Sequence, residues 1–361
     1  MEELYIDHGT LVPKEEWDAA ISTIRQATIL ARRGKTPVTE HKTGEQDAGR
    51  KNVDLDENEE NALEQAWQRA FQLAIKERVD AADGKAIGVL FSGGLDSTLI
   101  AHALYESGVP FTCYTVGFQD SGTKEPEDIV EARRTAQAMG WRIVERVYTL
   151  DEMETIIART AGILGDRTDN VSVGVGSVIV AGAQLAANDG VRILFSGLGS
   201  EEIFAGYERH ELALQDGGHE RLEEECWRGL AAMHEQDLKR DTLLSVALGI
   251  AIPTPFLDPA VIKQGMLLAV TGKIVDGQRK LVLRRMAINM GLPTTFAMRP
   301  KRAAQYGSRT DAAIERLARK AGYESKGSYV RALINTDNPD HHADRPTDDE
   351  TLRREHTPKS L

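Results

Sequence analysis

Residues 92–97, which read Ser-Gly-Gly-Leu-Asp-Ser, have the types and spacing that best fit a chemical role. Two adjacent glycines allow a tight turn whose N–H groups can approach phosphate oxygens, because no Cβ stands in the way. The next residues, 97–104, have the composition of a helix, and a helix N-terminus favours an anion by roughly 0.3 to 1 kcal/mol at an exposed site. The segment therefore predicts a loop that holds the β,γ-diphosphate of ATP.

Other glycine turns could give part of this pattern. A strand, a Gly-Gly turn and a helix also occur together in α/β proteins that bind no phosphate, so the glycine pair alone leaves both interpretations open. The complete Ser-Gly-Gly-x-Asp-Ser string favours the phosphate site. A Walker loop is excluded because no Gly-Lys-Ser/Thr follows the turn. A nucleophile elbow is excluded because no serine lies between two glycines in the Gly-x-Ser-x-Gly spacing.

A second glycine-rich turn, residues 196–200, follows the apolar run 191–195 and precedes two carboxylates, Glu201 and Glu202. Acidic residues in the first turn of a helix are also common partners of the helix dipole, so capping is an open alternative. Beside a triphosphate, a carboxylate could hold Mg²⁺, which offsets the charge that develops on the leaving pyrophosphate. The two turns together favour the second interpretation.

The elements that would position these turns alternate between strands and helices. This alternation predicts βαβ crossovers and an α/β fold with a doubly wound, mainly parallel sheet. Ligands bind beyond the carboxyl ends of such strands, where the first turn falls. Helical patterns dominate after about residue 208 and predict a helical C-terminal layer. The expected strands are 86–91, 111–116, 142–148 and 191–195, and the expected helices are 17–31, about 56–79, 97–104, 125–139, 151–161, 173–188, 220–236, 240–248, 259–268, 278–290 and 309–321.

Composition narrows the class of protein. The chain has 361 residues, 41% of them hydrophobic, which is enough for a substantial core. It has no run of 18 apolar residues and begins with acidic rather than basic residues, so we expect a cytoplasmic protein without a membrane partner. Cys113 and Cys226 form no Cys-x-x-Cys pair, which argues against zinc and disulfides. A net charge of -12 argues against nucleic acid as a partner.

The chain divides into three predicted parts. Residues 1–55 are expected to be an N-terminal extension with a flexible linker, because residues 33–52 have no hydrophobic period. Residues 56–335 are expected to form the α/β domain. Residues 336–361 are rich in Asp, Pro, His and Arg and are expected to be a disordered tail.

Four separate blocks, 92–97, 196–207, 255–258 and 299–301, resemble the synthetase half of the asparagine synthetase family, in the family's order. The resemblance covers 56–335 and includes no glutaminase domain. It implies the adenine nucleotide alpha hydrolase-like fold of the PP-loop ATP pyrophosphatases. Residues 205–210 and 300–309 are most similar to a less characterised branch of the family.

The resemblance also implies a reaction. ATP would adenylate a side-chain carboxylate and release pyrophosphate, after which ammonia, supplied free or by a separate glutaminase, would attack the acyl-adenylate. Lys301 would place its ammonium on the α-phosphate, although a lysine after a proline is otherwise an ordinary surface charge. By similarity, Ser92, Gly93, Gly94, Asp96 and Ser97 would hold pyrophosphate and its metal, Phe91, Val116, Ser196 and Gly197 would line the adenosine site, and Glu201 and Glu202 would stand near magnesium.

Several positions depart from the family's pattern. Leu198 stands where asparagine synthetases carry a glutamate associated with deprotonating the attacking ammonium, Pro253 replaces an arginine, and Glu201 replaces an aspartate. Met1 is followed by Glu2 rather than by the cysteine of the glutamine-using members. The adenylation residues are present, whereas amination and the choice of aspartate stay open. Ammonia could arrive neutral, Glu202 could act as the base, or the nucleophile could differ.

Other interpretations remain. Lys280, Arg284 and Arg285 fall on one expected helix and could contact a substrate anion or form a solvated basic face. Residues 255–258 are interpreted as scaffold that closes the site. The protein could be a PP-loop ligase for another acid and amine, or a catalytically silent subunit that binds nucleotide. A tRNA-modifying enzyme is disfavoured by the acidic charge and the lack of Cys-x-x-Cys pairs.

Overall fold

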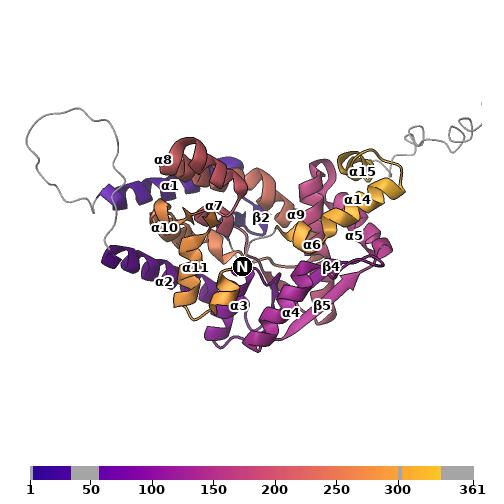
Figure 1. The fold of residues 1–361 in the computed structure, drawn as a ribbon, viewed down its shortest axis with the longest axis horizontal. Helices are drawn as coiled ribbons and strands as arrows, with labels where there is room; N and C mark the ends of the chain where they lie inside the picture. Colours follow the sequence, from indigo (N-terminus) through magenta and orange to yellow (C-terminus); the bar gives the residue numbers. More distant parts are fainter. Residues whose placement is uncertain (1–2, 34–56, 300–302, 335–361) are drawn as a thin grey trace, which may run out of the picture.

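The computed structural model describes residues 3–33, 57–299 and 303–334. At its centre lies a four-stranded parallel sheet with the strand order β5-β4-β3-β6 (Figure 1). Of the two inner strands, β3 pairs with β4 and β6, and Ile87 of β3 lies opposite Phe111 of β4 and Ile193 of β6. The strands are β3 (Ile87–Leu90), β4 (Phe111–Phe118), β5 (Ile143–Tyr148) and β6 (Ile193–Phe195).

Helices cover both faces of this sheet, as its buried strands require. Alternate residues along each strand face two separate hydrophobic clusters: Val89 and Cys113 face one, and Tyr114 and Leu194 face the other. The predicted doubly wound α/β fold is therefore confirmed. On the first face lie α2 (Glu57–Ala81), α3 (Leu95–Glu106) and α4 (Glu127–Met139), and on the second lie α5 (Leu150–Leu164) and α6 (Asn170–Asn188).

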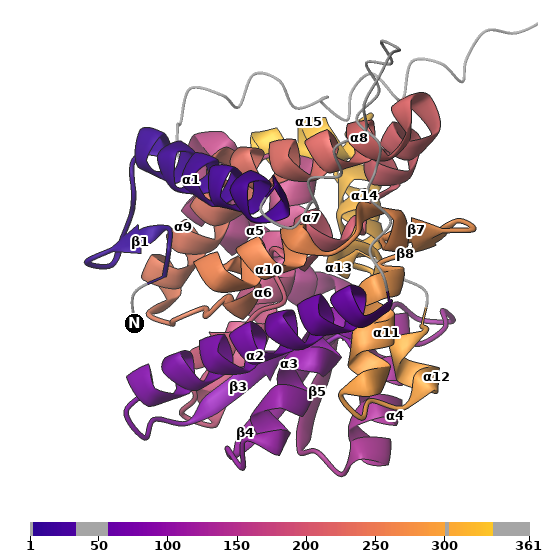
Figure 2. The ribbon, with the colours of Figure 1, turned by 90° about the vertical axis from the view of Figure 1, so that its left-hand side faces the viewer.

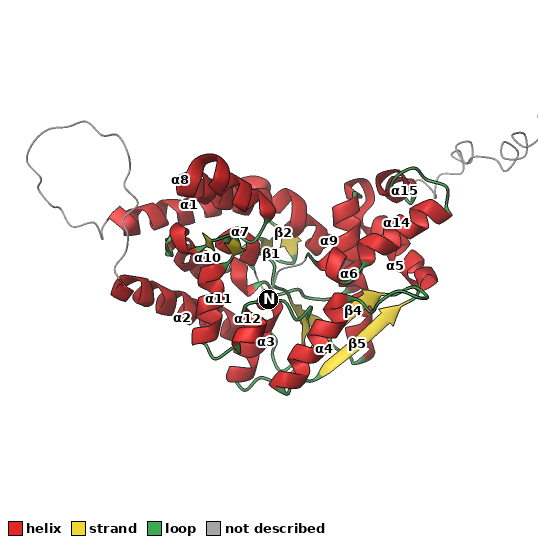
Figure 3. Cartoon of the chain, viewed as in Figure 1, coloured by secondary structure: helices red, strands yellow, loops and turns green. Residues whose placement is uncertain are grey.

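The C-terminal half adds further helices to both faces, as Figure 3 shows in red. The predicted helical layer is present, but it includes a small hairpin that the sequence did not predict. Its helices are α7 (Ser200–Phe204), α8 (Glu208–Ala232), α9 (Lys239–Leu248), α10 (Pro259–Leu267), α11 (Leu281–Asn289), α12 (Thr294–Ala297), α13 (Ala304–Gly307), α14 (Thr310–Lys320) and α15 (Lys326–Ala332), and the hairpin pairs β7 (Ile274–Val275) with β8 (Gln278–Arg279).

The N-terminal segment packs on the domain (Figure 2). A hairpin of β1 (Ile6–Asp7) and β2 (Thr10–Leu11) leads into α1 (Lys14–Arg33). Trp17 of α1 is fully buried and donates from Nε1 to the carbonyl of Leu230 at 3.1 Å. Residues 3–33 thus share the core of the domain. The expected linker lies mostly outside the described residues, the expected tail lies entirely outside them, and the predicted boundary at residue 56 stays a prediction.

The helix α2 shows why the sequence pattern places apolar residues inward. Leu63, Trp67 and Phe71 recur at four-residue steps and are all buried. The ring of Trp67 stacks on Phe71 with centroids 5.0 Å apart, and Phe71 contacts Phe256 with centroids 4.9 Å apart. The helix is therefore fixed against residues 255–257, which supports their interpretation as scaffold.

Only α6, among the described helices, is long and apolar enough by composition to cross a membrane. In its most apolar stretch of 18 residues, 61% are buried inside the fold. A central core helix meets the same criterion, because it contacts apolar side chains on most of its sides.

Candidate active site

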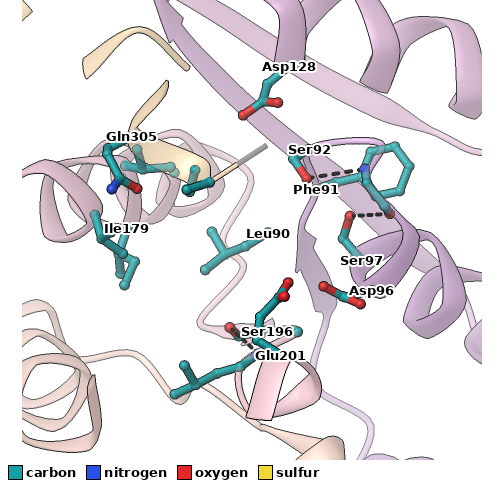
Figure 4. A pocket seen from close by; sticks show the side chains of 18 of the residues that line it. Leu90, Phe91, Ser92, Asp96, Ser97, Asp128, Ile179, Ser196, Glu201 and Gln305 are labelled. Atoms are coloured by element: carbon teal, nitrogen blue, oxygen red, sulfur yellow. Dashed lines mark hydrogen bonds between the residues drawn. The ribbon is translucent and has the colours of Figure 1, made fainter. Parts of the chain in front are cut away.

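The first glycine turn lies where β3 ends and α3 begins. Gly93 adopts a φ of +67°, and Gly94 is the N-cap residue of α3. The turn is fixed by its own hydrogen bonds: Gly94 N–H donates to Ser92 Oγ at 3.2 Å, and Ser97 Oγ donates to the Gly94 carbonyl at 3.2 Å (Figure 4). Since α3 has 12 residues, its N-terminus offers a full helix dipole to a ligand at this turn.

A side chain at Gly93 should disrupt this turn. A Cβ there would lie 2.7 Å from the carbonyl carbon of Glu131 and 2.8 Å from the nitrogen of Ala132. We expect Gly93→Ala to lower the free energy of unfolding by about 2 kcal/mol more than Gly84→Ala, because the control has a similar φ of +72° and open space around it. Urea unfolding of both variants measures the difference, and equal losses would contradict a specific fit at Gly93.

The second turn, between β6 and α7, lies directly against the first. A Cβ on Gly197 would lie 2.8 Å from the Cβ of Asp96, so the two turns are in contact. Residues 251–253 run beside β6, and Ser196 N–H donates to the carbonyl of Pro253 at 2.9 Å. Pro253 thus shapes the second turn through its backbone, and it is not among the residues that line the cavity described below.

One lysine joins the acidic residues of the two turns. Lys280 Nζ lies 2.7 Å from Asp96 Oδ2 and 2.6 Å from Glu201 Oε1, and it donates to Ser200 Oγ at 3.0 Å. Burial lowers the pKa of Lys280, but the carboxylates of Asp96 and Glu201 outweigh burial and leave the pKa above its usual value. Burial also raises the pKa of Asp96, against the opposing effect of Lys280.

This position corrects the expected helix over residues 278–290. Residues 278–279 belong to the β7–β8 hairpin, and α11 begins at Leu281. Lys280 lies between them with a φ of +58°, so the three basic residues do not share one helical face. Arg284 donates to the backbone carbonyls of residues 297 and 299 at 2.7 Å, and Arg285 pairs with Glu64 at 2.6 Å.

The two turns open into a cavity of about 320 Å³, within the size range of small-molecule sites. Part of the lining is apolar: Leu90 and Val116 of the sheet share one hydrophobic cluster with Val175 and Ile179 of α6, and this suits a flat heterocycle. The ring of Phe91 instead packs against Trp141 on the opposite face of the sheet. In Figure 4, Asp96, Ser196 and Glu201 lie near one another, with Ile179 and Gln305 across the cavity. The predicted residues that line the cavity are Phe91, Ser92, Gly94, Asp96, Ser97, Val116, Ser196, Gly197 and Glu201.

Three predicted residues are not placed in the cavity. Gly93 shapes the turn from behind, against the backbone of α4. Glu202 is 2% exposed, receives a hydrogen bond from Arg209 at 3.3 Å and is not among the lining residues. The role of Glu202 as a base therefore stays a prediction. Lys301 lies outside the described residues.

Glu202 should instead make stability depend on pH. Burial, followed by the charges of Asp237 and Glu201, raises the pKa of Glu202 to about 7 from a usual value of 4.5. The folded state therefore keeps the proton to higher pH than the unfolded state does, and the free energy of unfolding falls as pH rises from about 4.5 to about 7. We expect Glu202→Gln to remove a fall on the order of 3 kcal/mol.

Urea unfolding of the wild type and Glu202→Gln at pH 5 and pH 8 measures this effect. Glu220→Gln is a suitable control, because Glu220 is an exposed glutamate of α8. The control should follow the wild type. Parallel pH dependence in the wild type and Glu202→Gln would show that the carboxyl of Glu202 is not held neutral by burial.

The sequence did not identify several charged residues of the cavity wall. Arg240 lines the cavity and lies between Asp237 at 2.8 Å and Asp241 at 2.7 Å. Arg299 donates from Nη1 to the carbonyl of Ser92 at 3.0 Å and so ties the segment before residue 300 to the first turn. The sequence around Arg240 reads Asp-x-x-Arg-Asp, which could have indicated a charged cluster at a binding site. On a helix the same spacing equally predicts an ion pair exposed to solvent.

The donor set fits a magnesium ion bound together with phosphate. Mg²⁺ is usually held by one or two carboxylates plus phosphate oxygens and water, and Asp96 and Glu201 supply two carboxylates that converge on one point. Within 3–33, 57–299 and 303–334, no group of three or more His, Cys, Asp or Glu side chains could hold a metal alone. Asp96 and Glu201 would hold the ion only with oxygens from a ligand.

Comparison with known proteins identifies the family. The asparagine synthase family matches residues 66–216 and 213–359. The rat asparagine synthetase [glutamine-hydrolyzing] is 30% identical over 66% of this chain and 42% of its own length. The mouse asparagine synthetase domain-containing protein 1 is 27% identical over 70% of this chain and 50% of its own length. The human protein of the same name is 32% identical over 45% of this chain and 26% of its own length. The chain spans half or less of the length of these relatives. The glycine turns, the parallel sheet and this match agree, and the chain belongs to the asparagine synthase family.

Proposed function

We propose that this protein is an amidoligase that activates a carboxylate with ATP and forms an amide, most simply asparagine from aspartate. A carboxylate oxygen attacks the α-phosphorus of ATP, and the bond to pyrophosphate breaks. An amine then attacks the acyl carbon, AMP leaves, and the amine gives up a proton. Activation is required because a free carboxylate is unreactive toward amines.

The observation that carries this proposal is the shape of the cavity. Gly94 and the first residues of α3 line the same cavity as an apolar slot formed by Leu90, Val116 and Ile179. A nucleotide whose base occupies the slot directs its phosphates toward the helix N-terminus, which stabilises negative charge. Magnesium held by Asp96 and Glu201 would offset the charge that develops on pyrophosphate.

The nitrogen source and the location in the cell are parts of the same proposal. Ammonia would be taken free or received from a separate glutaminase, and the protein would act in the cytoplasm. The rat relative, which is named as glutamine-hydrolyzing, supports an ammonia donor only by analogy, since this chain matches less than half of its length.

A second candidate, a ligase for another amine, is supported by Leu198. This side chain lines the cavity, and leucine cannot accept a proton. The carboxylates Asp237 and Asp241 in the same cavity are engaged by Arg240. An amine that is already neutral, such as hydroxylamine near pH 7, would need no base at this position.

Release of pyrophosphate and AMP, measured with a panel of carboxylic acids, tests both candidates. Each acid is combined with ammonia, hydroxylamine, glutamine or no nitrogen donor. Pyrophosphate release that depends on aspartate, and amide formation with ammonia, would support asparagine synthesis. Release with another acid, or amide formation with hydroxylamine only, would favour the second candidate. ATP binding by calorimetry without release for any acid would instead indicate a silent nucleotide-binding subunit.

A further inference from the structure

Lys280 is the most enclosed charge of the candidate site. Its side chain is 2% exposed, and its ammonium lies within 3.0 Å of four oxygen atoms, two on Asp96, one on Ser200 and one on Glu201. These partners come from α3 and α7, whereas Lys280 itself precedes α11. The ammonium therefore joins three elements that are far apart in the sequence.

The backbone around Lys280 has an unusual conformation that places its ammonium between the two carboxylates. Lys280 adopts a φ of +58°, a conformation that is unfavourable for a residue with a side chain and persists only where the surroundings require it. The facing residue, Gly206, has no side chain, and a Cβ there would collide with both Glu201 and Lys280. The glycine leaves the space in which the carboxylate and the ammonium meet.

The same geometry bears on metal binding. A cation that bridges Asp96 and Glu201 must lie close to both carboxylates, and Lys280 Nζ occupies that point, at 2.7 Å from one and 2.6 Å from the other. A dication and an ammonium cannot both take the same carboxylate oxygens, since like charges at such distances repel strongly inside a protein. The ammonium can leave only if other anionic oxygens receive it.

We propose that Lys280 is a resident counter-ion that keeps the Asp96–Glu201 pair assembled in the absence of metal and prevents free divalent metal from binding there. The phosphates of an incoming nucleotide offer the ammonium new acceptors, so the carboxylates become available to metal only when nucleotide is present. Lys280 is thus a positioning residue that makes metal binding conditional on nucleotide. The inference rests on the assignment of Asp96 and Glu201 as metal ligands and not on the acid or the amine used.

Titration with Mn²⁺ alone, followed by electron paramagnetic resonance, tests this proposal. The wild type without nucleotide should show no saturable site. Lys280→Met, which keeps an apolar stem and removes the charge, should bind Mn²⁺ at least about tenfold more tightly than the wild type. Lys280→Arg keeps a cation and should not gain the site. Adding Asp96→Asn to Lys280→Met should abolish the gain.

Lys273→Met is a matched control. Lys273 is also buried, at 1% exposure, but its ammonium contacts Met266 Sδ at 3.6 Å rather than the carboxylates of the site. It should gain no Mn²⁺ site. Equal Mn²⁺ affinity in the wild type and Lys280→Met, or equal gains in Lys273→Met and Lys280→Met, would overturn the proposal.

Thermal unfolding keeps the proposal testable if Lys280→Met folds poorly. The loss of the ammonium leaves two carboxylates facing each other, so Mn²⁺ should raise the melting temperature of this variant and should not raise that of the wild type. If Mn²⁺ does not raise the melting temperature of Lys280→Met, the proposal is contradicted. In that case Lys280 would only hold the fold together, and metal could not replace it. Neither measurement contains an acid, an amine or ATP. A negative result would therefore overturn the role of Lys280 without deciding whether the protein is an amidoligase.

Discussion

Asp96→Asn should lower the rate of pyrophosphate release by at least about a thousandfold while the protein remains folded. Asp96 lies in the first turn of α3 and lines the cavity beside the two glycine turns. Its carboxylate accepts hydrogen bonds from Lys280 and Ser200, so the substitution removes one negative charge from a cluster of two acids and one base. Asparagine keeps the shape but is a poor metal ligand, and the metal-bound pyrophosphate would lose one of its two protein carboxylates.

The measurement is pyrophosphate release with the best acid of the panel, together with calorimetric binding of ATP in the presence of Mg²⁺. Asp80→Asn is the control, because Asp80 forms an exposed pair with Lys76 on α2. The control should retain wild-type rates. If Asp96→Asn keeps its activity, Asp96 does not hold metal or phosphate, and the proposed function loses its structural basis.

Lys301→Ala should lower the same rate by about 100- to 1000-fold, as expected for removal of a cation that stabilises charge developing in the transition state. Lys301 lies outside the described residues, and the prediction depends on its position in the sequence after Arg299. Arg299 contacts the carbonyl of Ser92 in the first glycine turn, so the chain is fixed beside the cavity two residues before Lys301.

Single-turnover measurements separate this role from nucleotide binding. The rate of adenylation should fall in Lys301→Ala, whereas the dissociation constant of ATP should change much less, because a transition-state contact contributes mainly to the rate. Lys320→Ala removes a lysine of α14 that is 56% exposed and should have no effect. A loss confined to ATP affinity would assign Lys301 to ground-state binding instead.

Sequence patterns predicted the sheet and the glycine turns because both depend on local information. The run over 86–91 and the Gly93–Gly94 pair specify a buried strand and a tight turn within a few residues of each other. The apolar face of α2 was equally visible, since Leu63, Trp67 and Phe71 repeat at helical spacing. These elements require no knowledge of distant contacts.

The charged part of the site could not be predicted in the same way, because it depends on contacts between distant segments. Lys280 meets Asp96 across 184 residues of sequence, and the short hairpin before it carries too few residues for a strand pattern. The roles of Arg299 and Arg240 likewise depend on the residues they contact in the fold rather than on the residues beside them in the sequence. Glu202 is the opposite case, since it follows Glu201 directly on α7 and yet is not among the residues that line the cavity.

The buried ion pair at the start of the chain has a practical consequence for recombinant fragments. Glu3 binds Arg78 of α2 at 2.6 Å, and Arg78 also contacts Asp258, the N-cap residue of α10, at 3.3 Å. A fragment that starts at residue 56 would leave the buried guanidinium of Arg78 without its Glu3 partner. It would also expose the apolar surface that Trp17 covers. Recombinant fragments made for crystallisation should therefore retain residues 3–33.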